Sequence, residues 1–323
     1  MMTDVDQMPN AILLALAPVF FVLLLGYAAG RWRIVDNRQV DGLNALVMDF
    51  ALPASLFVAT ASAPRHEMVA QGPLFALLGL VMLGLYLAWY AYARVTSRAS
   101  KADAALQALT IAFPNLAGVG LPITSAVLGP SGVVPVAIAL AAGSIIVSPL
   151  TLILVEMGRT VEERATSTSM ISRVLRALRP ALAKPVVLAP ALGILFSLSA
   201  LPLGVVAESS LTLIGQAAAG VALFLTGLIL SAAPFKLDWK IVAATGAADI
   251  ARPLLTAAIV TALPISAEVG KVAILLMAVP SGFFGILFAV NYRLDSAVIG
   301  SMVTASTVLS IVTMAVTIAV LFP

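Results

Sequence analysis

Long apolar runs separated by short polar loops form the dominant pattern of this chain. Ten runs are close to the roughly 20 residues that an α-helix needs to cross the hydrocarbon core of a bilayer. They lie at about 11–30, 40–60, 71–93, 104–128, 132–156, 181–199, 208–231, 239–263, 268–291 and 296–322. The pattern therefore predicts an all-α polytopic membrane protein with ten transmembrane helices.

The fourth run is interrupted in its middle. Residues 113–123 read Phe-Pro-Asn-Leu-Ala-Gly-Val-Gly-Leu-Pro-Ile, so that Pro114 and Pro122 flank Gly118 and Gly120. Proline lacks a backbone N–H and clashes with the carbonyl four residues earlier, and glycine weakens a helix further. Within hydrocarbon, freed backbone groups are tolerated only where they are buried in protein or line a wet cavity. We therefore expect a broken helix at a functional place.

The ninth run is interrupted in the same way. Residues 278–290 read Ala-Val-Pro-Ser-Gly-Phe-Phe-Gly-Ile-Leu-Phe-Ala-Val, and Pro280 follows Pro114 by 166 residues, which aligns Ser281 with Asn115. Two interrupted segments at matching places in two halves indicate the substrate site of a secondary transporter. The residues at the breaks that we predict to bind substrate are Pro114, Asn115, Gly118, Gly120, Pro280, Ser281 and Gly282.

Other parts of the two halves also match. Leu56-Phe57 recurs as Leu223-Phe224 after 167 residues, close to the separation of the two breaks. We therefore predict two five-helix repeats, residues 1–156 and 181–323, joined by a loop at 157–180. Because five is an odd number, the second repeat has the opposite orientation, which makes this an inverted-topology repeat.

The basic residues predict how the helices are oriented. If the chain begins outside, fifteen of the eighteen Lys and Arg residues fall in loops on the inner side, whereas Arg65 and Lys271 lie outside and Arg252 lies within a helix. Such an excess on the cytoplasmic side is the usual bias of membrane proteins. We therefore expect both termini outside, the 157–180 loop inside, and no role of these basic residues in binding nucleic acid.

Composition excludes several other classes of function. The chain is 61% hydrophobic and only 10% charged, and it contains no cysteine and one histidine. It has no Gly-x-Ser-x-Gly elbow, no cluster of metal-ligating side chains and no phosphate-binding Gly-x-x-x-x-Gly-Lys motif. We therefore expect no enzyme activity, no metal site and no cofactor.

Few charged residues lie at bilayer depth. Asp49, Asp249 and Arg252 do, and intramembrane charges usually face the protein interior and mark substrate or ion paths. Asp249 and Arg252, three residues apart on one helix, either neutralise each other or leave Arg252 available to an anion. Asp49 is either a packing residue or a group that carries a proton. Ser55, two residues after Pro53, either faces the same cavity or bonds its own backbone.

These motifs resemble those of the auxin efflux carrier family of secondary transporters, essentially end to end. The resemblance is carried by Phe50-Ala-Leu-Pro-Ala-Ser-Leu-Phe57, by Phe113-Pro-Asn115 followed by Gly120-Leu-Pro-Ile123, and by Arg252-Pro253. Within the family, Leu43-Asn44, Val47–Ala54 and Leu121–Ile123 look most similar to bacterial malonate carriers of the inner membrane.

The resemblance implies that helices four and nine cross at their prolines. It also implies that segments 1, 2, 6 and 7 form a scaffold, often the surface of a homodimer, and that segments 3–5 and 8–10 form the moving transport domain. This chain departs from the family pattern at the second break, where Ser281 stands at the position that Asn115 has in the first. Strong coordination of a ligand by polar side chains from both breaks is therefore not expected.

We therefore expect a secondary active transporter of a small organic anion, malonate or a similar dicarboxylate, that works by alternating access in the lipid bilayer. An efflux carrier of an aromatic carboxylate, such as an auxin-like indole acid, is the alternative transport function. A passive anion channel is the alternative from another class. For proton coupling the sequence offers Asp49 and Asp249, and we favour Asp49 because it has no basic residue within one turn of its own helix.

Overall fold

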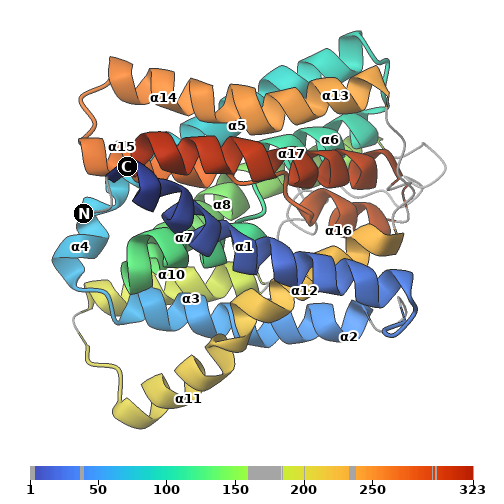
Figure 1. Cartoon of the computed structure of the whole chain (residues 1–323). Helices are drawn as coiled ribbons and strands as arrows, with labels where there is room; N and C mark the ends of the chain where they lie inside the picture. Colours follow the sequence, from blue (N-terminus) through green and yellow to red (C-terminus); the bar gives the residue numbers. More distant parts are fainter. Residues whose placement is uncertain are drawn as a thin grey trace, which may run out of the picture.

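The computed structural model describes residues 4–36, 40–158, 183, 185–199, 201–232, 238–292, 294 and 297–322, and these residues form helices and connecting turns (Figure 1). In the first half the longer elements are α1 (Asp4–Arg31), α2 (Val40–Ala45), α3 (Leu52–Ala61), α4 (Arg65–Ala70), α5 (Gly72–Val95), α6 (Lys101–Ala112), α7 (Leu121–Leu128) and α8 (Val133–Gly158). In the second half they are α10 (Pro185–Leu198), α11 (Val205–Gly215), α12 (Ala217–Ala232), α13 (Trp239–Gly246), α14 (Arg252–Ala262), α15 (Ala267–Ala278), α16 (Phe284–Asn291) and α17 (Ala297–Leu321). Most of the predicted 157–180 linker lies outside the described residues.

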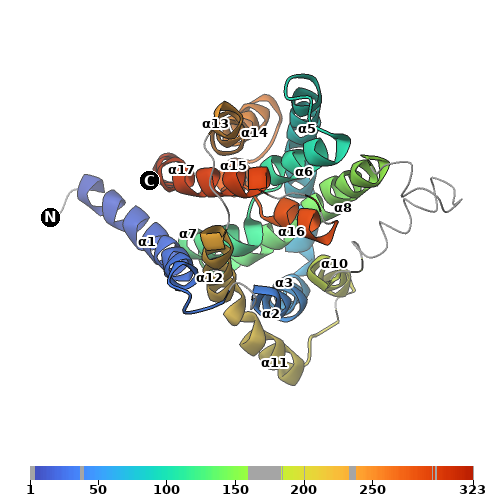
Figure 2. The same ribbon diagram turned by 90° about the vertical axis from the view of Figure 1, so that its right-hand side faces the viewer.

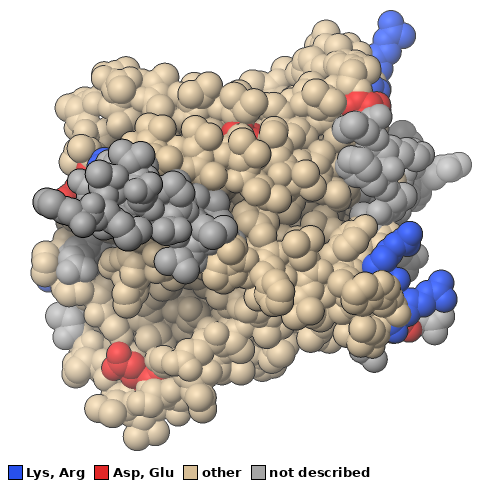
Figure 3. Space-filling view, viewed as in Figure 1, with Lys and Arg blue, Asp and Glu red and all other residues tan. Residues whose placement is uncertain are grey.

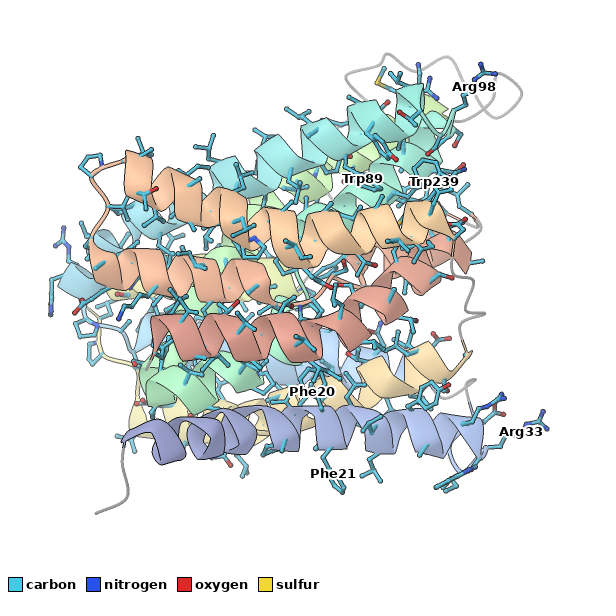
Figure 4. All side chains as sticks on the ribbon, turned by 45° about the horizontal axis from the view of Figure 1, so that its top comes forward. Phe20, Phe21, Arg33, Trp89, Arg98 and Trp239 are labelled. Atoms are coloured by element: carbon cyan, nitrogen blue, oxygen red, sulfur yellow. The ribbon has the colours of Figure 1, made fainter. Side chains whose placement is uncertain are left out.

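Helices are found at every apolar run predicted from the sequence, so the all-helical membrane class is confirmed. Six stretches of the described residues are long and apolar enough to cross a bilayer. They are Val40–Ala61, Gly72–Val95, Leu116–Val155, Val205–Ala232, Trp239–Ala262 and Ala297–Leu321. Shorter apolar helices occur at Ala17–Arg31 and Leu188–Leu198. The lipid-facing character is visible on α1, where Phe20 points into the molecule and Phe21, 66% exposed, points away (Figure 4).

The helices form two groups, and α7 and α16, which follow the two breaks, lie between them (Figure 2). The first group, called here the α12 group, contains α1, α2, α3, α10, α11 and α12, with α1 packed on α12 and α3 packed on α10. The second, called the α14 group, contains α5, α6, α8, α13, α14, α15 and α17, with α5 packed on α6 and α8.

Glycines allow close approach within the α12 group. A Cβ on Gly26 of α1 would overlap the carbonyl of Phe224 on α12, and a Cβ on Gly193 of α10 would overlap Thr60 and crowd the carbonyl of Phe57 on α3. Gly193 lies 167 residues after Gly26, and Phe224 lies 167 residues after Phe57. The contact therefore recurs with the two halves of the chain exchanged.

In the described part of the chain, three single π-helical turns interrupt the helices. One residue separates the end of each turn from a proline. They are η2 (Leu46–Ala51), η3 (Leu116–Gly120) and η6 (Ala247–Ala251). Pro53, Pro122 and Pro253 follow them as the second residue of the next helix. Since proline has no N–H to give to the carbonyl four residues earlier, the backbone widens to bonds that span five residues, such as Arg252 N–H to Ala247 O.

The two ends of the molecule differ in charge. The start of α1 and the end of α17 lie at the same end as α4, whereas Arg33 and Arg98 lie at the opposite end (Figures 1 and 4). Most of the Lys and Arg side chains visible in the space-filling view gather at that opposite end (Figure 3). Trp89 and Trp239 lie there as well, in an aromatic cluster with Tyr92. Tryptophan and tyrosine are typical of the level of the lipid headgroups.

Candidate functional site

The two breaks meet at the centre of the molecule. α6 ends at Ala112 and α15 ends at Ala278, and the extended segments that follow pair through an antiparallel bridge between Pro114 and Ser281. The N–H of Asn115 donates to the carbonyl of Pro280 at 2.8 Å. Each broken segment thus supplies a partner to the backbone of the other. This pairing, here called the crossover, is buried, with Asn115 and Ser281 each 1% exposed.

The second break needs glycine for this approach. A Cβ on Gly282 would overlap the carbonyl of Phe113, and the Gly282 N–H donates to the carbonyl of Thr110 at 3.1 Å. Aromatic rings pack beside it: Phe113 stacks on Phe284 with centroids 4.9 Å apart, and Phe284 stacks on Phe283 at 5.4 Å. Gly282 is therefore a contact between the two segments, and three rings close one side of the crossover.

Asn115 has one amide atom bonded and one free. Its Oδ1 accepts the N–H of Gly118 at 2.9 Å, which caps the helical segment that begins with η3. Its Nδ2 is buried and has no hydrogen-bond partner among the described residues. A buried donor without a partner costs free energy, so such an atom indicates either strain or a ligand.

The α12 group contributes a hydroxyl to the same point. A Cβ placed on Gly118 would lie 2.8 Å from Thr226 Oγ1 and 3.0 Å from Asn115 Nδ2. Thr226 donates to the carbonyl of Ala222 on its own helix, which leaves its oxygen able to accept. Because Gly118 has no side chain, the Asn115 amide and the hydroxyl of Thr226 on α12 can approach the same point.

Arg252 is wholly buried, and each of its three side-chain nitrogens donates a hydrogen bond. Nε donates to the carbonyl of Met277 at 2.7 Å, Nη1 donates to the carbonyl of Ile111, and Nη2 donates to the carbonyl of Val279. These carbonyls end α6 and α15, the two helices that stop at the crossover. In this conformation the guanidinium therefore binds the carboxyl ends of both broken helices.

Asp249 is buried one turn from Arg252 but takes its hydrogen bond from a serine. Ser306 of α17 donates to Asp249 Oδ1 at 2.6 Å and accepts the N–H of Ser281 at 2.8 Å. The other oxygen, Oδ2, is buried and has no partner among the described residues. Asp249 is thereby connected to the second break through one hydroxyl group.

The remaining predicted residues lie elsewhere. The expected burial of Asp49 is wrong: Asp49 and Phe50 are exposed, whereas Val47 and Met48 occupy the buried face of the same helix. Its carboxyl is thus on the side of η2 opposite the core. Ser55 is half-buried, and its backbone approaches Gly215 at the end of α11, away from the crossover.

Gly120, which the sequence predicted to bind substrate, is buried, and a Cβ there would meet only its own segment, at Leu116 and Asn115. Sequence reasoning missed Thr226 and Ser306. Each shares its apolar helix with other hydroxyl residues. Such residues commonly bond their own backbone, so nothing local distinguished these two.

Two cavities lie near the end of the molecule that carries α4. One, of about 490 Å³, is lined by Gln71, Ser131, Glu268, Lys271 and Phe322 among others. The other, of about 400 Å³, is lined by Ser62, Arg65, Ser197 and Glu208 among others. The polar atoms of the crossover belong to neither, and they are shut off from solvent. Among the described residues, no group of three or more His, Cys, Asp or Glu could hold a metal ion.

Comparison with known proteins places this arrangement among transporters. Residues 11–318 match the model of a family described as "Membrane transport protein". The chain is 29% identical over 303 residues to the uncharacterized transporter YfdV of Escherichia coli K12, a match that covers 90% of this chain and 94% of that protein. The YfdV proteins of Escherichia coli O157:H7 and Shigella flexneri match to the same extent.

Proposed function

The chain belongs to the membrane transport protein family, the auxin efflux carrier family of secondary transporters, and on that premise we propose that it carries a small organic anion. The substrate binds at the crossover, and access alternates between the two sides of the membrane. The observation that carries the proposal is the unpartnered Asn115 Nδ2, which is buried where two broken helices and Thr226 meet. A carboxylate oxygen accepts from such a donor.

Malonate or a similar dicarboxylate is the substrate we propose. Its support is the resemblance of residues 43–54 and 121–123 to bacterial malonate carriers. The helical segments that begin at Asn115 and Phe284 both start at the crossover, and such ends carry partial positive charge that favours anions. Two of these ends suit a substrate with two carboxylates.

An aromatic carboxylate is the second candidate, because Phe113, Phe283 and Phe284 stack beside the crossover. An indole acid could add its ring to such a stack, since offset and edge contacts between aromatic rings are favourable. Competition between malonate and an indole acid in one uptake assay separates the two substrates.

The finer architecture is part of the same proposal. We propose ten spans in two inverted repeats, with the α12 group as a scaffold that forms a homodimer and the α14 group as the moving domain. The Gly26–Phe224 contact has a counterpart in Gly193–Phe57, with the two halves of the chain exchanged, and this supports the repeat. The basic end seen in Figure 3 supports an inner-membrane protein with both termini on the periplasmic side.

The test uses purified protein in liposomes and labelled malonate. A carrier gives uptake that saturates with concentration and accelerates when unlabelled malonate is loaded inside, whereas a passive channel gives neither. Saturable uptake of the indole acid alone would move the assignment to the aromatic substrate. The absence of saturation and of exchange with either compound would overturn the carrier proposal.

Two variants of Asn115 test the site. Asn115→Ala removes the cap and the donor, and Asn115→Asp keeps an oxygen for the Gly118 N–H but lacks the amide donor. We expect both to express and insert normally and to lose uptake by tenfold or more, on the order of 1.4 kcal/mol. Normal transport by Asn115→Asp would mean that the amide donor does not bind substrate.

A further inference from the structure

Asp249 lies at the end of a short chain of polar groups that leads to the crossover. The Ser306 hydroxyl donates to Asp249 and accepts from the Ser281 N–H, so it is engaged on both sides. Ser281 in turn pairs with Pro114, the residue before Asn115. One hydroxyl group therefore joins a buried carboxyl to the backbone that shapes the proposed substrate site.

The hydrogen bonding of Asp249 is incomplete. Oδ2 is buried and unpartnered, and Asp249 is 1% exposed. The nearest cation is Arg252, whose Nε, Nη1 and Nη2 all donate to main-chain carbonyls. An unpartnered, buried carboxylate oxygen is a place where a proton or a cation can bind.

Few other charges face Asp249. The elements packed against η6 are α6, α13, α14, α15 and α17. Arg252 of α14 is the charged residue that acts on Asp249 electrostatically. The charged residues of the other described elements lie near the starts of their helices, at Lys101 and Asp103, at Lys240 with the capping Asp238, and at Glu268 and Lys271. α17 contains no charged residue.

The charges around the crossover determine whether an anion binds better when Asp249 is protonated or ionised. Two helix carboxyl ends carry about half a negative charge each and the two amino ends about half a positive charge each, so that the four ends cancel. The formal charges that remain are Arg252 and Asp249. With Asp249 ionised the site is neutral and a monoanion, such as singly protonated malonate, makes it negative. With Asp249 protonated the site is positive and the same monoanion neutralises it. Anion binding and proton binding are therefore mutually favourable.

We propose that Asp249 binds the proton that travels with the anion, and that Ser306 is the positioning residue that links this carboxyl to the crossover. The inference rests on the proposed anion transport. A proton from water on one side joins the Asp249 carboxylate, crosses with the anion and leaves to water on the other side, and no bond of the substrate changes. Asp49, exposed on η2, has no part in it.

The first experiment needs no substrate. Infrared spectra of the purified protein are recorded across a pH series, and the C=O stretch of a protonated carboxyl is followed. We expect one band that titrates in the wild type, is missing in Asp249→Asn and persists in Asp49→Asn, the matched change in an exposed residue also four positions before a proline. Ser306→Ala should change the frequency of the band, because it removes the hydrogen bond to Oδ1.

The second experiment measures labelled malonate uptake in liposomes. With one proton for each malonate monoanion, a gradient of one pH unit supports about a tenfold accumulation of that monoanion. We expect Asp249→Asn to exchange malonate but to lose this gradient-driven accumulation, and Asp49→Asn to keep it. The pH profile of Ser306→Ala should move to higher pH by about one unit, since the bond it removes stabilises the charged form. Ser306→Thr should restore the profile.

A matched control for Ser306 is Ser310→Ala, because Ser310 is a buried serine one turn further along α17 that bonds only the carbonyl of Thr307 in its own helix. If Asp249→Asn does not fold, the comparison of Ser306→Ala with Ser310→Ala decides the question. Equal profiles and equal spectra for these two variants would overturn the inference.

Three further outcomes bear on the inference. Accumulation that is driven by a sodium gradient and is insensitive to pH would overturn proton binding by Asp249 and assign its Oδ2 to the binding of a cation. Absence of malonate transport in the wild type, together with an infrared band that depends on Asp249, would defeat the proposed substrate but leave the protonation site standing. Wild-type transport without such a band at any pH would overturn the site alone.

Discussion

Arg252 shows how one buried charge can serve two helices. Its guanidinium reaches the carbonyls of Ile111, Met277 and Val279, which end α6 and α15 at the crossover. Each of these helix ends carries about half a negative charge, so one full positive charge matches both. The amino ends of the segments that follow keep their positive character, which an anion can use. On the proposed function, Arg252 would act on an anion at the crossover through the helix ends rather than by direct contact.

Replacing Arg252 should destabilise the protein as well as stop transport. Arg252→Ala leaves three buried carbonyls without partners, and each such loss costs about 1–3 kcal/mol. Arg252→Lys keeps the charge but cannot reach three carbonyls with a planar fork, so we expect it to recover only part of the stability. Thermal unfolding in detergent measures the effect. Wild-type unfolding temperatures for both variants would contradict the assigned contacts.

Among the helices, prolines determine where the regular α-helical hydrogen bonding is interrupted. Pro53, Pro122 and Pro253 each follow a π-helical turn, because a missing N–H forces the preceding turn to widen. Such a turn rotates the residues before it relative to those after it. Asp49 and Asp249 both stand four residues before a proline, yet only Asp249 is turned into the core. The neighbouring helices, rather than the local motif, decide which carboxyl is buried.

The packing of α1 on α12 provides a prediction at the same scale. Gly26→Ala places a methyl group against the carbonyl of Phe224, and such overpacking costs about 1–3 kcal/mol. Gly220→Ala on α12 is the matched control, since a Cβ there meets nothing within 4 Å. Unfolding in detergent should occur at a lower temperature for Gly26→Ala and at an unchanged or slightly higher temperature for the control. Equal stability of the two variants would count against the close contact.

At the scale of the whole molecule, charge and aromatic residues mark the two ends. Arg33, Arg98, Trp89 and Trp239 lie at one end, and the chain termini with α4 lie at the other (Figures 1 and 4). An excess of arginine is typical of the cytoplasmic side of a membrane protein, and tryptophan is typical of either interface. The two cavities lie near the opposite end, which on this orientation faces the periplasm.

The absence of cysteine from the sequence makes this orientation testable. Single cysteines introduced as His66→Cys in α4 and Thr96→Cys after α5 are the unique labelling sites of their variants. A membrane-impermeant thiol reagent added to intact spheroplasts should label the first and not the second until the membrane is opened. Labelling of both from outside, or of the second alone, would reverse or refute the proposed sidedness.

Much of the architecture could be predicted from the sequence alone, because it depends on local rules. Apolar length predicted the long apolar helices of the described residues, although not the short α4, and Pro114 and Pro280 located the two breaks. A proline has no N–H with which to continue a regular helix. The pairing of the breaks followed from their matching positions in two halves. The family was also recognisable from short motifs at these places.

The direction and partners of single side chains were decided only by the tertiary structure. Asp49 and Asp249 look alike in sequence, but packing exposes one and buries the other, so the preference for Asp49 rested on a burial that does not occur. Arg252 binds carbonyls of two distant helices, and Ser306 and Thr226 reach the crossover from helices with no local signal. Such contacts join residues that are remote in the chain, and helix period and hydropathy carry no information about which remote atoms will meet.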